Sequence, residues 1–351
     1  MEALSMVKDM DMNYPREDRT LHNTGLCDGF CGYKEWFHYE TEVFIGDDPL
    51  TMVLGCVASR PAIGCLGWFS FRGIQYSLAG NPPDASHKGF FILKTHATIQ
   101  PNPTGYTMEF SSSTGSTGSV EGKFPTYLVS LKNSQIDLGI TMNIKEPEKS
   151  IASRSLSPWM SGGWFHSGDV AVTLEGNICG ERVFSRDERN RGWYERNWSK
   201  IPVFWPSQWF FMMIHLDNGA VLDLYRITTL KIPVHFFDEC WIYENQVFTP
   251  FTSYDVTIPP SLYDAIRAYD YEPILKEEIS ACSAGGDHDN SFSFTAQIED
   301  FRHYTVNKYY ARIGWSNFFL RTSGEALVDG KSMDMTGRGI AELCQVSYWW
   351  L

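Results

Sequence analysis

Short segments in which apolar and polar residues alternate recur along most of this 351-residue chain. The segment HYETEVFIG (38–46) alternates into a GDDP turn, and WFFMMIHL and AVLDLYRI are joined by Asp217-Asn218-Gly219. An Asn-Gly pair between two such runs indicates a hairpin, because both residues tolerate the positive φ angles of a tight turn. Alternation with a period of two is typical of strands, so the sequence predicts an all-β chain of antiparallel sheets.

Two further segments extend this pattern. DVAVTLEGNICGERVF (169–184) predicts two strands joined at Glu175-Gly176-Asn177, and NKYYARIGWSNFFLR (307–321) predicts another aromatic pair of strands. One short helix is expected over about 260–278, where a proline opens an apolar pattern at helical spacing and Pro273 breaks it.

The length of the chain favours about two domains. We place the boundary near residue 229, because a complete hairpin ends at Arg226 and a new set of strands begins at HFFDECWIYENQVF (235–248). The expected domains are residues 1–228 and 229–351, each a β-sandwich or β-barrel.

Composition limits the classes of partner. The chain is 43% hydrophobic and 15% aromatic with 12 Trp, which favours a cavity walled by flat apolar rings and therefore an apolar ligand. The net charge of −13 and the lack of a run of Lys/Arg interleaved with aromatic residues argue against nucleic acid or an anionic membrane surface as a partner.

No signal peptide and no stretch of about 18 apolar residues is evident, so we expect a soluble, cytoplasmic protein without membrane insertion. The eight scattered cysteines are interpreted as buried or free thiols.

Several catalytic motifs are missing from the sequence. It contains no GxGxxG opening a helix, no GxxxxGK[ST], no HExxH and no GxSxG. Redox, phosphoryl-transfer and serine-hydrolase chemistry therefore lose support, and acid–base chemistry from carboxylates and histidines remains.

The segment RGWYERNWS (191–199) carries the best candidate acid. In a strand, Trp193, Glu195 and Asn197 share one face, while Tyr194, Arg196 and Trp198 share the other. A carboxyl group that aromatic rings shield from water has a raised pKa and can donate a proton at neutral pH. The alternative is that Glu195 only pairs with Arg196 or Arg191 at the rim of a sheet.

A second cluster is KEWFHYE (34–40). Glu35, Phe37 and Tyr39 would lie on one strand face, and Trp36, His38 and Glu40 on the other. His38 and His166 are each either catalytic or structural, hydrogen-bonded residues. Because no set of His, Asp and Glu shows metal-ligand spacing in the sequence, we assign no metal ion.

These motifs resemble one family. EWFHYE is similar to the EWWYF-type segment that opens the first domain of the AttH and carotenoid 1,2-hydratase (CrtC)-like proteins. GWYERNWS and the hairpin after it resemble that family's glycine–aromatic–x–acid segment and its W-F-x-x-x-L-D-D-G hairpin, and TGRGIAEL (336–343) resembles its closing glycine-rich strand. Together the motifs span most of the chain in the family's order.

The resemblance implies two lipocalin-like (calycin) β domains with a ligand cavity at or near their junction. It also implies cofactor-free chemistry on apolar polycyclic or prenylated substrates, as in carotenoid hydratases, kievitone hydratase, fungal Diels–Alderases and Brønsted-acid epoxide cyclases. The acidic position implicated in hydration maps onto Glu195, where the hydratases tend to have Asp, and the preceding aromatic maps onto Trp193, where they tend to have Tyr.

The sequence therefore leads to a cofactor-independent cyclase or isomerase of secondary metabolism in which Glu195 protonates an epoxide, alkene or carbonyl group. His38, Glu35 and His166 are candidate bases for the final proton. Alternatives are a pericyclase (Diels–Alderase) or a hydratase using the same pocket, a non-catalytic lipocalin-type carrier of an apolar metabolite, and a structural protein whose tryptophans are core only. The expected substrate-binding residues are Trp193, Tyr194, Asn197, Trp198, Trp36, His166, Trp209, Phe211 and Tyr225. The sequence does not predict an oligomeric state.

Overall fold

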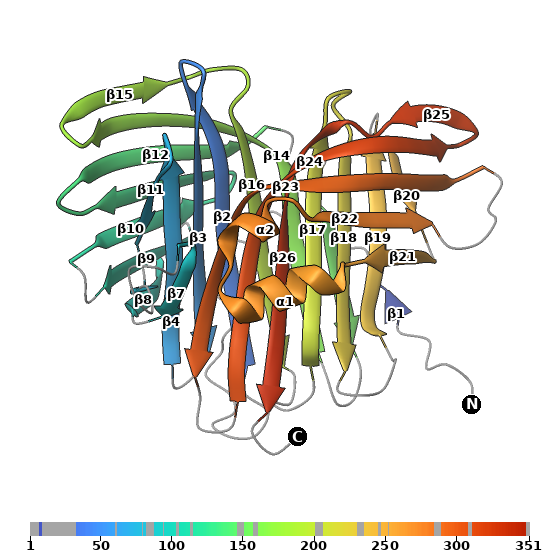
Figure 1. Ribbon diagram of the computed structural model, residues 1–351, viewed down its shortest axis with the longest axis horizontal. Helices are drawn as coiled ribbons and strands as arrows, with labels where there is room; N and C mark the ends of the chain where they lie inside the picture. The colour runs from blue at the N-terminus through green and yellow to red at the C-terminus, as the bar shows by residue number, and fades with distance from the viewer. Residues whose placement is uncertain are drawn as a thin grey trace. The chain divides into compact units, whose positions relative to one another are not determined.

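The computed structural model describes most of the chain (Figure 1). The described residues are 7–8, 33–59, 62–78, 80–81, 88–93, 95–102, 105–112, 115–145, 151–156, 161–200, 206–229, 235–244, 247–251, 253–283, 289–307 and 311–348, some of them by their backbone alone. Strands dominate and pair mostly in antiparallel fashion, which confirms the predicted all-β class.

The chain divides into two compact units. The first comprises residues 1–81 and 93–205, and the second comprises residues 82–92 and 206–351. The hairpin over 206–229, which the sequence assigned to the first domain, instead belongs to the sheet of the second unit. It does so because its first strand pairs with the last strand of the chain, Gln208 opposite Gln345 through Leu216 opposite Gly337. A local pattern does not reveal so distant a pairing.

One long antiparallel sheet forms the first unit, in the order β5-β4-β3-β2-β16-β14-β12-β11-β10-β9-β8. β13 and β15 each pair with β14, and β1 pairs with β13. The strands of this sheet are β1 (Val7–Lys8), β2 (Tyr33–Ile45), β3 (Asp48–Ser59), β4 (Ala62–Phe71), β5 (Ile74–Ser77), β8 (Thr95–Asn102), β9 (Gly105–Ser112), β10 (Thr117–Lys123), β11 (Thr126–Lys132), β12 (Ile136–Ile144), β13 (Ile151–Leu156), β14 (Ser161–Ile178), β15 (Glu181–Ser185) and β16 (Arg191–Lys200). The two-residue strand β6 (Gly80–Asn81) belongs to the other sheet.

The core of the first unit lies on one face of this sheet. Alternate residues of β2, beginning with Phe37 and Tyr39, pack with Tyr194 of β16 and with apolar residues of β3, β9, β11, β12 and β14. Since alternate residues of a strand point to opposite faces, the residues between them in β2 and β16 lie on the second face, which carries the candidate site.

The second unit has the order β20-β19-β18-β17-β26-β24-β23-β22-β21, which matches the first nine strands of the first unit's order. β25 pairs with β24, and β7 pairs with β23 in parallel. The elements are β7 (Phe90–Leu93), β17 (Pro206–Leu216), β18 (Val221–Thr229), β19 (His235–Glu244), β20 (Val247–Pro250), β21 (Tyr254–Thr257), α1 (Pro260–Ala268), α2 (Tyr271–Ile274), β22 (Glu278–Ser283), β23 (Ser291–Asn307), β24 (Ala311–Val328), β25 (Lys331–Asp334) and β26 (Gly337–Tyr348).

Where the sequence predicted one helix, the structure has two. α1 begins at Pro260, as predicted, but it ends at Ala268 because Tyr269 adopts a left-handed conformation with φ 57°. The short helix α2 follows and contains Pro273. Leu262 and Ile266 of α1 and Ile274 of α2 are buried in the core of the second unit.

One predicted turn is wrong, and a second is confirmed with a different backbone conformation. The expected turn at Glu175-Gly176-Asn177 is wrong: β14 continues through these residues, and the chain reverses at Cys179-Gly180, where both φ angles are positive. Gly176 is required for another reason, since a Cβ there would lie 2.1 Å from the Asp137 carbonyl oxygen. The hairpin at 217–219 is confirmed, but of its Asn-Gly pair only Gly219 has a positive φ, and the Asn218 side chain accepts a hydrogen bond from the Ala220 amide.

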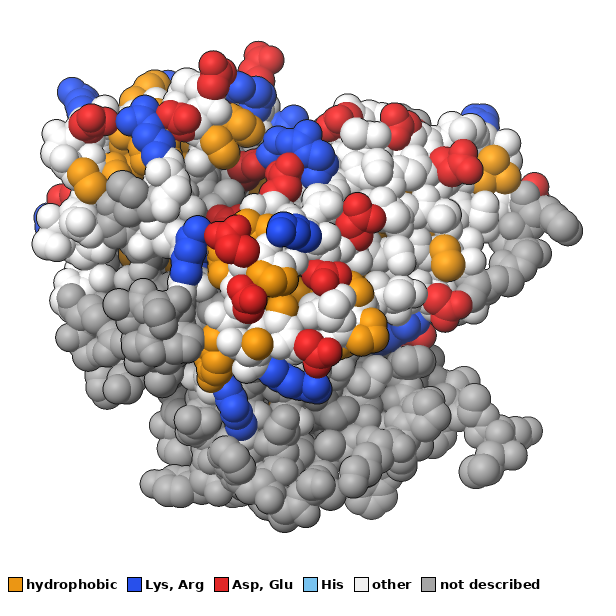
Figure 2. Space-filling model, in the orientation of Figure 1, with side chains coloured by type: hydrophobic (Ala, Val, Ile, Leu, Met, Phe, Trp, Pro, Cys, Tyr) orange, Lys and Arg blue, Asp and Glu red, His pale blue; other side chains and the backbone are white. Residues whose placement is uncertain are grey.

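Acidic and basic side chains are interspersed on the face shown in Figure 2. Cys240 and Cys282 are free thiols, whereas Cys27 and Cys31 lie outside the described residues. Within the described part of the chain, neither helix has the length and apolar character needed to cross a bilayer.

Candidate functional site

Three neighbouring strands of the first unit bring together the main candidates from the sequence. His166 of β14 lies opposite Glu195 of β16, and Glu195 lies opposite His38 of β2. Residues opposite each other in antiparallel strands share a face, so the three side chains form one row across the sheet. This row lies on the face away from the first unit's core.

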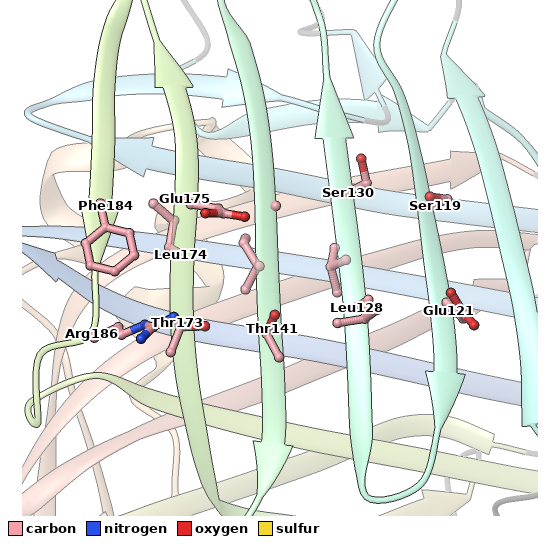
Figure 3. A pocket seen from close by; sticks show the side chains of 13 residues that line it. Ser119, Glu121, Leu128, Ser130, Thr141, Thr173, Leu174, Glu175, Phe184 and Arg186 are labelled. Carbon is pink, nitrogen blue, oxygen red and sulfur yellow. The ribbon is translucent and has the colours of Figure 1, made fainter.

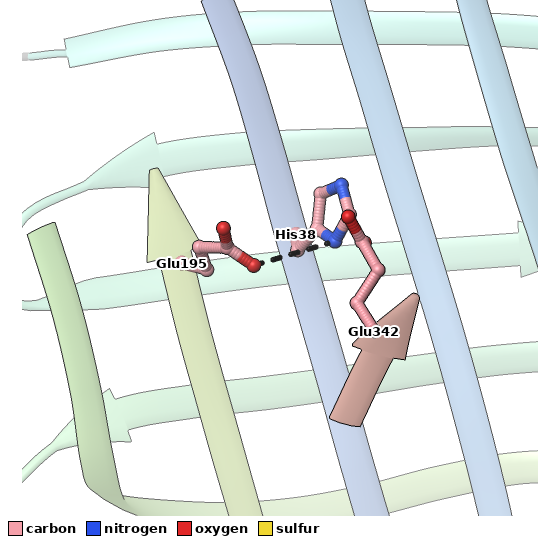
Figure 4. Close-up of side chains that lie close together, drawn as sticks. All are labelled: His38, Glu195 and Glu342. Carbon is pink, nitrogen blue, oxygen red and sulfur yellow. Dashed lines mark ion pairs between the residues drawn. The ribbon is translucent and has the colours of Figure 1, made fainter. Parts of the chain in front are cut away.

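The row is buried and closely spaced. The Glu195 side chain is 3% exposed, and those of His38 and His166 are each 1% exposed. His38 Nδ1 lies 3.6 Å from Glu195 Oε2, the ion pair drawn in Figure 4, and His166 Nε2 lies 3.7 Å from Glu195 Oε1. A carboxyl group therefore sits between two imidazoles, away from bulk water.

Asn197 connects His166 with Glu195. Its Nδ2 donates a hydrogen bond to Glu195 Oε1, and its Oδ1 lies 3.2 Å from His166 Nε2. Because an amide oxygen only accepts, this orientation assigns the proton of His166 to Nε2. The amide therefore fixes both the carboxyl oxygen and the imidazole tautomer.

Further polar and aromatic residues surround the row. Glu40, two residues along β2 from His38, places Oε1 3.8 Å from His38 Nδ1. Trp193 of β16 lies opposite Glu40 of β2. In the same row of paired residues, Trp68 of β4 lies two strands beyond Glu40, on the side away from β16. Glu40, Trp193 and Trp68 are buried. The sequence placed Glu40 on the His38 face but did not select it, and Trp68 carried no local signal because only long-range pairing brings it here.

Tyr194 corrects one expectation. It lies in the core on the opposite face from Glu195, where its ring stacks on Tyr127 with centroids 4.3 Å apart and its hydroxyl lies 2.9 Å from that of Tyr106. Arg196 points the same way, with its guanidinium 4.9 Å from the centre of the Phe37 ring. These residues hold β16 in place from behind and do not border the Glu195 row.

The other candidates are placed as follows. Asn197 and Trp36 lie opposite each other on β16 and β2. The side chains of Glu35 and Trp198 lie outside the described residues.

Three further candidates, Trp209, Phe211 and Tyr225, belong to the second unit and lie on the sheet face opposite its core. Phe211 contacts Tyr225 edge-to-face with ring centres 6.2 Å apart. Glu342, also drawn in Figure 4, belongs to the second unit too and accepts a hydrogen bond from Trp209 Nε1 at 2.5 Å.

Among the described residues of the first unit taken alone, no three His, Cys, Asp or Glu side chains place ligand atoms close enough together to share one ion. The first unit does bring a carboxyl group within 3.7 Å of two imidazoles, an arrangement suited to proton transfer.

A surface hollow of about 430 Å³ lies away from this row (Figure 3). Its lining comes from β10, β11, β12, β14 and β15, with Leu128 and Phe184 exposed and Glu121, Glu175 and Arg186 nearby. None of the residues predicted from the sequence lines it, and its open, mixed polar surface offers no grouped acid and base.

Comparison with known proteins identifies the fold. No family model and no curated protein sequence matches the chain. Kievitone hydratase from Nectria haematococca has a similar structure, with a TM-score of 0.55, 11% identity, and coverage of 95% of this chain and 97% of that one.

Two further structures are similar. The AttH-like protein NE1406 from Nitrosomonas europaea has a TM-score of 0.52 at 12% identity, covering 92% of this chain and 94% of that one. CghA, also solved with Sch210972, has a TM-score of 0.52 at 13% identity, covering 90% of this chain and 89% of that one. The resemblance drawn from the sequence motifs is thus confirmed at the level of the fold, which this chain shares with kievitone hydratase, the AttH-like protein and CghA.

Proposed function

We propose that the protein is a cofactor-independent cyclase or isomerase of secondary metabolism in which Glu195 acts as a Brønsted acid on an apolar, prenylated substrate. The observation that carries this proposal is the buried His166–Glu195–His38 row. The shared fold with kievitone hydratase, a hydratase by name, adds support for chemistry on an apolar small molecule.

For an epoxide substrate the reaction balances without a cofactor. Glu195 donates its proton to the epoxide oxygen as the adjacent C–O bond breaks. A hydroxyl group of the same molecule attacks the carbon, and its proton passes to His38. Return of that proton from His38 to Glu195 restores the site, and the product is an isomer of the substrate. The 3.6 Å between His38 Nδ1 and Glu195 Oε2 needs only a shift of less than about 1 Å to reach hydrogen-bond distance.

The neighbouring residues have matching roles. Asn197 holds one carboxyl oxygen of Glu195, so the other oxygen is directed toward His38. Burial lowers the local dielectric constant and strengthens electrostatic stabilisation of charge in the transition state. The ring of Trp193 is suited to stabilise positive charge that develops on carbon.

The test is Glu195→Gln assayed with an ortho-prenylphenol epoxide, because Gln preserves shape and removes the acidic proton. We expect turnover to fall by about 10²–10⁴-fold while substrate affinity is retained. Glu121→Gln, an exposed residue of β10, is the matched control and should retain activity.

Product analysis by mass spectrometry separates the alternatives. A cyclase gives a product of unchanged mass and altered retention time, whereas a hydratase adds the mass of one water. A decline of less than about tenfold in Glu195→Gln indicates a pericyclase that works by shape. Recovery of the epoxide unchanged after prolonged incubation indicates a carrier and overturns the proposal.

A further inference from the structure

The two units share an arrangement that relates Glu195 to Glu342. In both units an 18-residue strand, β14 or β24, turns through a pair of positive-φ residues into a short strand, β15 or β25. The next long strand, β16 or β26, then pairs with the 18-residue strand on one side and with β2 or β17 on the other. In the first unit the row is His166–Glu195–His38, and in the second it is Asn317–Glu342–Phe211.

The second row also lies on the face away from its unit's core. Phe318 and Leu320 of β24 and Ala341 and Leu343 of β26 belong to the core, so Asn317 and Glu342 point to the other face. Asn317, Glu342 and Phe211 are all buried. Trp209 donates to Glu342 and contacts Trp315 edge-to-face with ring centres 6.0 Å apart, which gives this face an aromatic border.

Asn317 is the unusual member of this row. Its side chain is buried, yet neither Oδ1 nor Nδ2 has a hydrogen-bond partner in the described structure. A buried polar group without a partner is costly, so native proteins seldom keep one without a use. His166, its counterpart in the first unit, contacts Asn197, but the equivalent position here on β26 is Cys344.

We propose that Asn317 and Glu342 bind a neutral carboxamide group attached to an aromatic or apolar body. An amide offers one donor and one acceptor side by side, so its complement must offer an acceptor and a donor. An ammonium group would satisfy only Oδ1, and a carboxylate only Nδ2. A carboxylate would also face Glu342, which lies opposite Asn317 on the neighbouring strand. A primary or secondary carboxamide satisfies both atoms and carries no charge.

The test is binding of 2-naphthamide to the full chain, measured by calorimetry and by tryptophan fluorescence. Saturable binding is expected, with 2-naphthoate and 2-naphthylmethylammonium binding at least about tenfold more weakly. Asn317→Leu should weaken 2-naphthamide binding by about 10–100-fold, as two lost hydrogen bonds require. Asn143→Leu, at an exposed position of β12, is the matched control and should bind as the parent does.

The melting temperature provides a second readout. Leu removes an unpartnered polar group from a buried site, so Asn317→Leu should melt at or above the parent temperature. A lower melting temperature with unchanged 2-naphthamide affinity would assign Asn317 a purely structural role and overturn the proposal, as would equal affinity for all three probes. Because no turnover is measured, neither result depends on whether Glu195 acts as an acid.

Discussion

At the scale of single residues, the position of Asn197 determines what Glu195 and its two histidines can do. Its amide binds one oxygen of Glu195 and faces His166 Nε2, so His166 is held as a donor. His38 Nδ1, in contrast, faces the carboxyl groups of Glu195 and Glu40. The two histidines are therefore not equivalent: His166 is suited to orient Glu195, and His38 to exchange protons with it.

Replacement of each histidine by glutamine should separate these roles. His38→Gln removes the proposed base and should lower kcat by about 10²-fold or more. His166→Gln keeps an N–H group able to reach Asn197 and should lower kcat by less than about tenfold. Steady-state kinetics on both variants gives the comparison, and equal losses would contradict the assignment of the base.

Much of this residue-scale picture followed from the sequence. Period-two alternation in 193–197 and 36–40 grouped Glu195 with Asn197 and His38 with Glu40, each on one strand face, and these segments are regular strands without bulges; the alternation did not say which face lines a cavity. The register that brings His166, Glu195 and His38 into one row depends on pairing between strands far apart in the chain, and single-segment patterns contain no such information. The same limit explains why Asn317 and Trp68 were not found.

At the scale of elements, β16 is held from behind by a chain of tyrosines. Tyr106 Oη lies 2.6 Å from Tyr39 Oη and 2.9 Å from Tyr194 Oη, linking β9 with β2 and β16. The two strands that carry His38 and Glu195 are therefore joined in the core as well as by their backbone hydrogen bonds. The elements that the sequence mispredicted, the turn at 175–177 and the single helix, are those where one glycine or one left-handed residue decides the path of the chain.

Tyr194→Phe tests this support. Loss of one buried hydroxyl should lower the free energy of unfolding by about 0.5–1.5 kcal/mol, because Tyr106 loses a hydrogen-bond partner. Urea unfolding followed by circular dichroism measures the change. Since Tyr194 faces the core, KM should stay within about twofold of the parent value; a large rise in KM with unchanged stability would instead place Tyr194 against the substrate.

At the scale of the whole molecule, each unit has its own hydrophobic core, so unfolding is expected in two transitions. His303 belongs to the second unit. Burial lowers the pKa of its imidazole from 6.5 to about 3, and the positive charge of Arg312 makes a smaller contribution in the same direction. Its Nδ1 lies 2.9 Å from Ser316 Oγ, and its ring stacks on Phe301.

The lowered pKa of His303 makes the second unit sensitive to acid. Between pH 6.5 and about 3 the unfolded chain binds a proton at this residue that the folded chain does not, so folding stability falls as the pH falls through this window. The slope approaches about 1.4 kcal/mol per pH unit. Calorimetry from pH 7 to pH 4 should show one transition moving to lower temperature through this effect, and His303→Gln should flatten its dependence on pH. If the slope survives in His303→Gln, then other groups cause the acid sensitivity, and the imidazole is protonated in the folded unit as readily as in the unfolded chain.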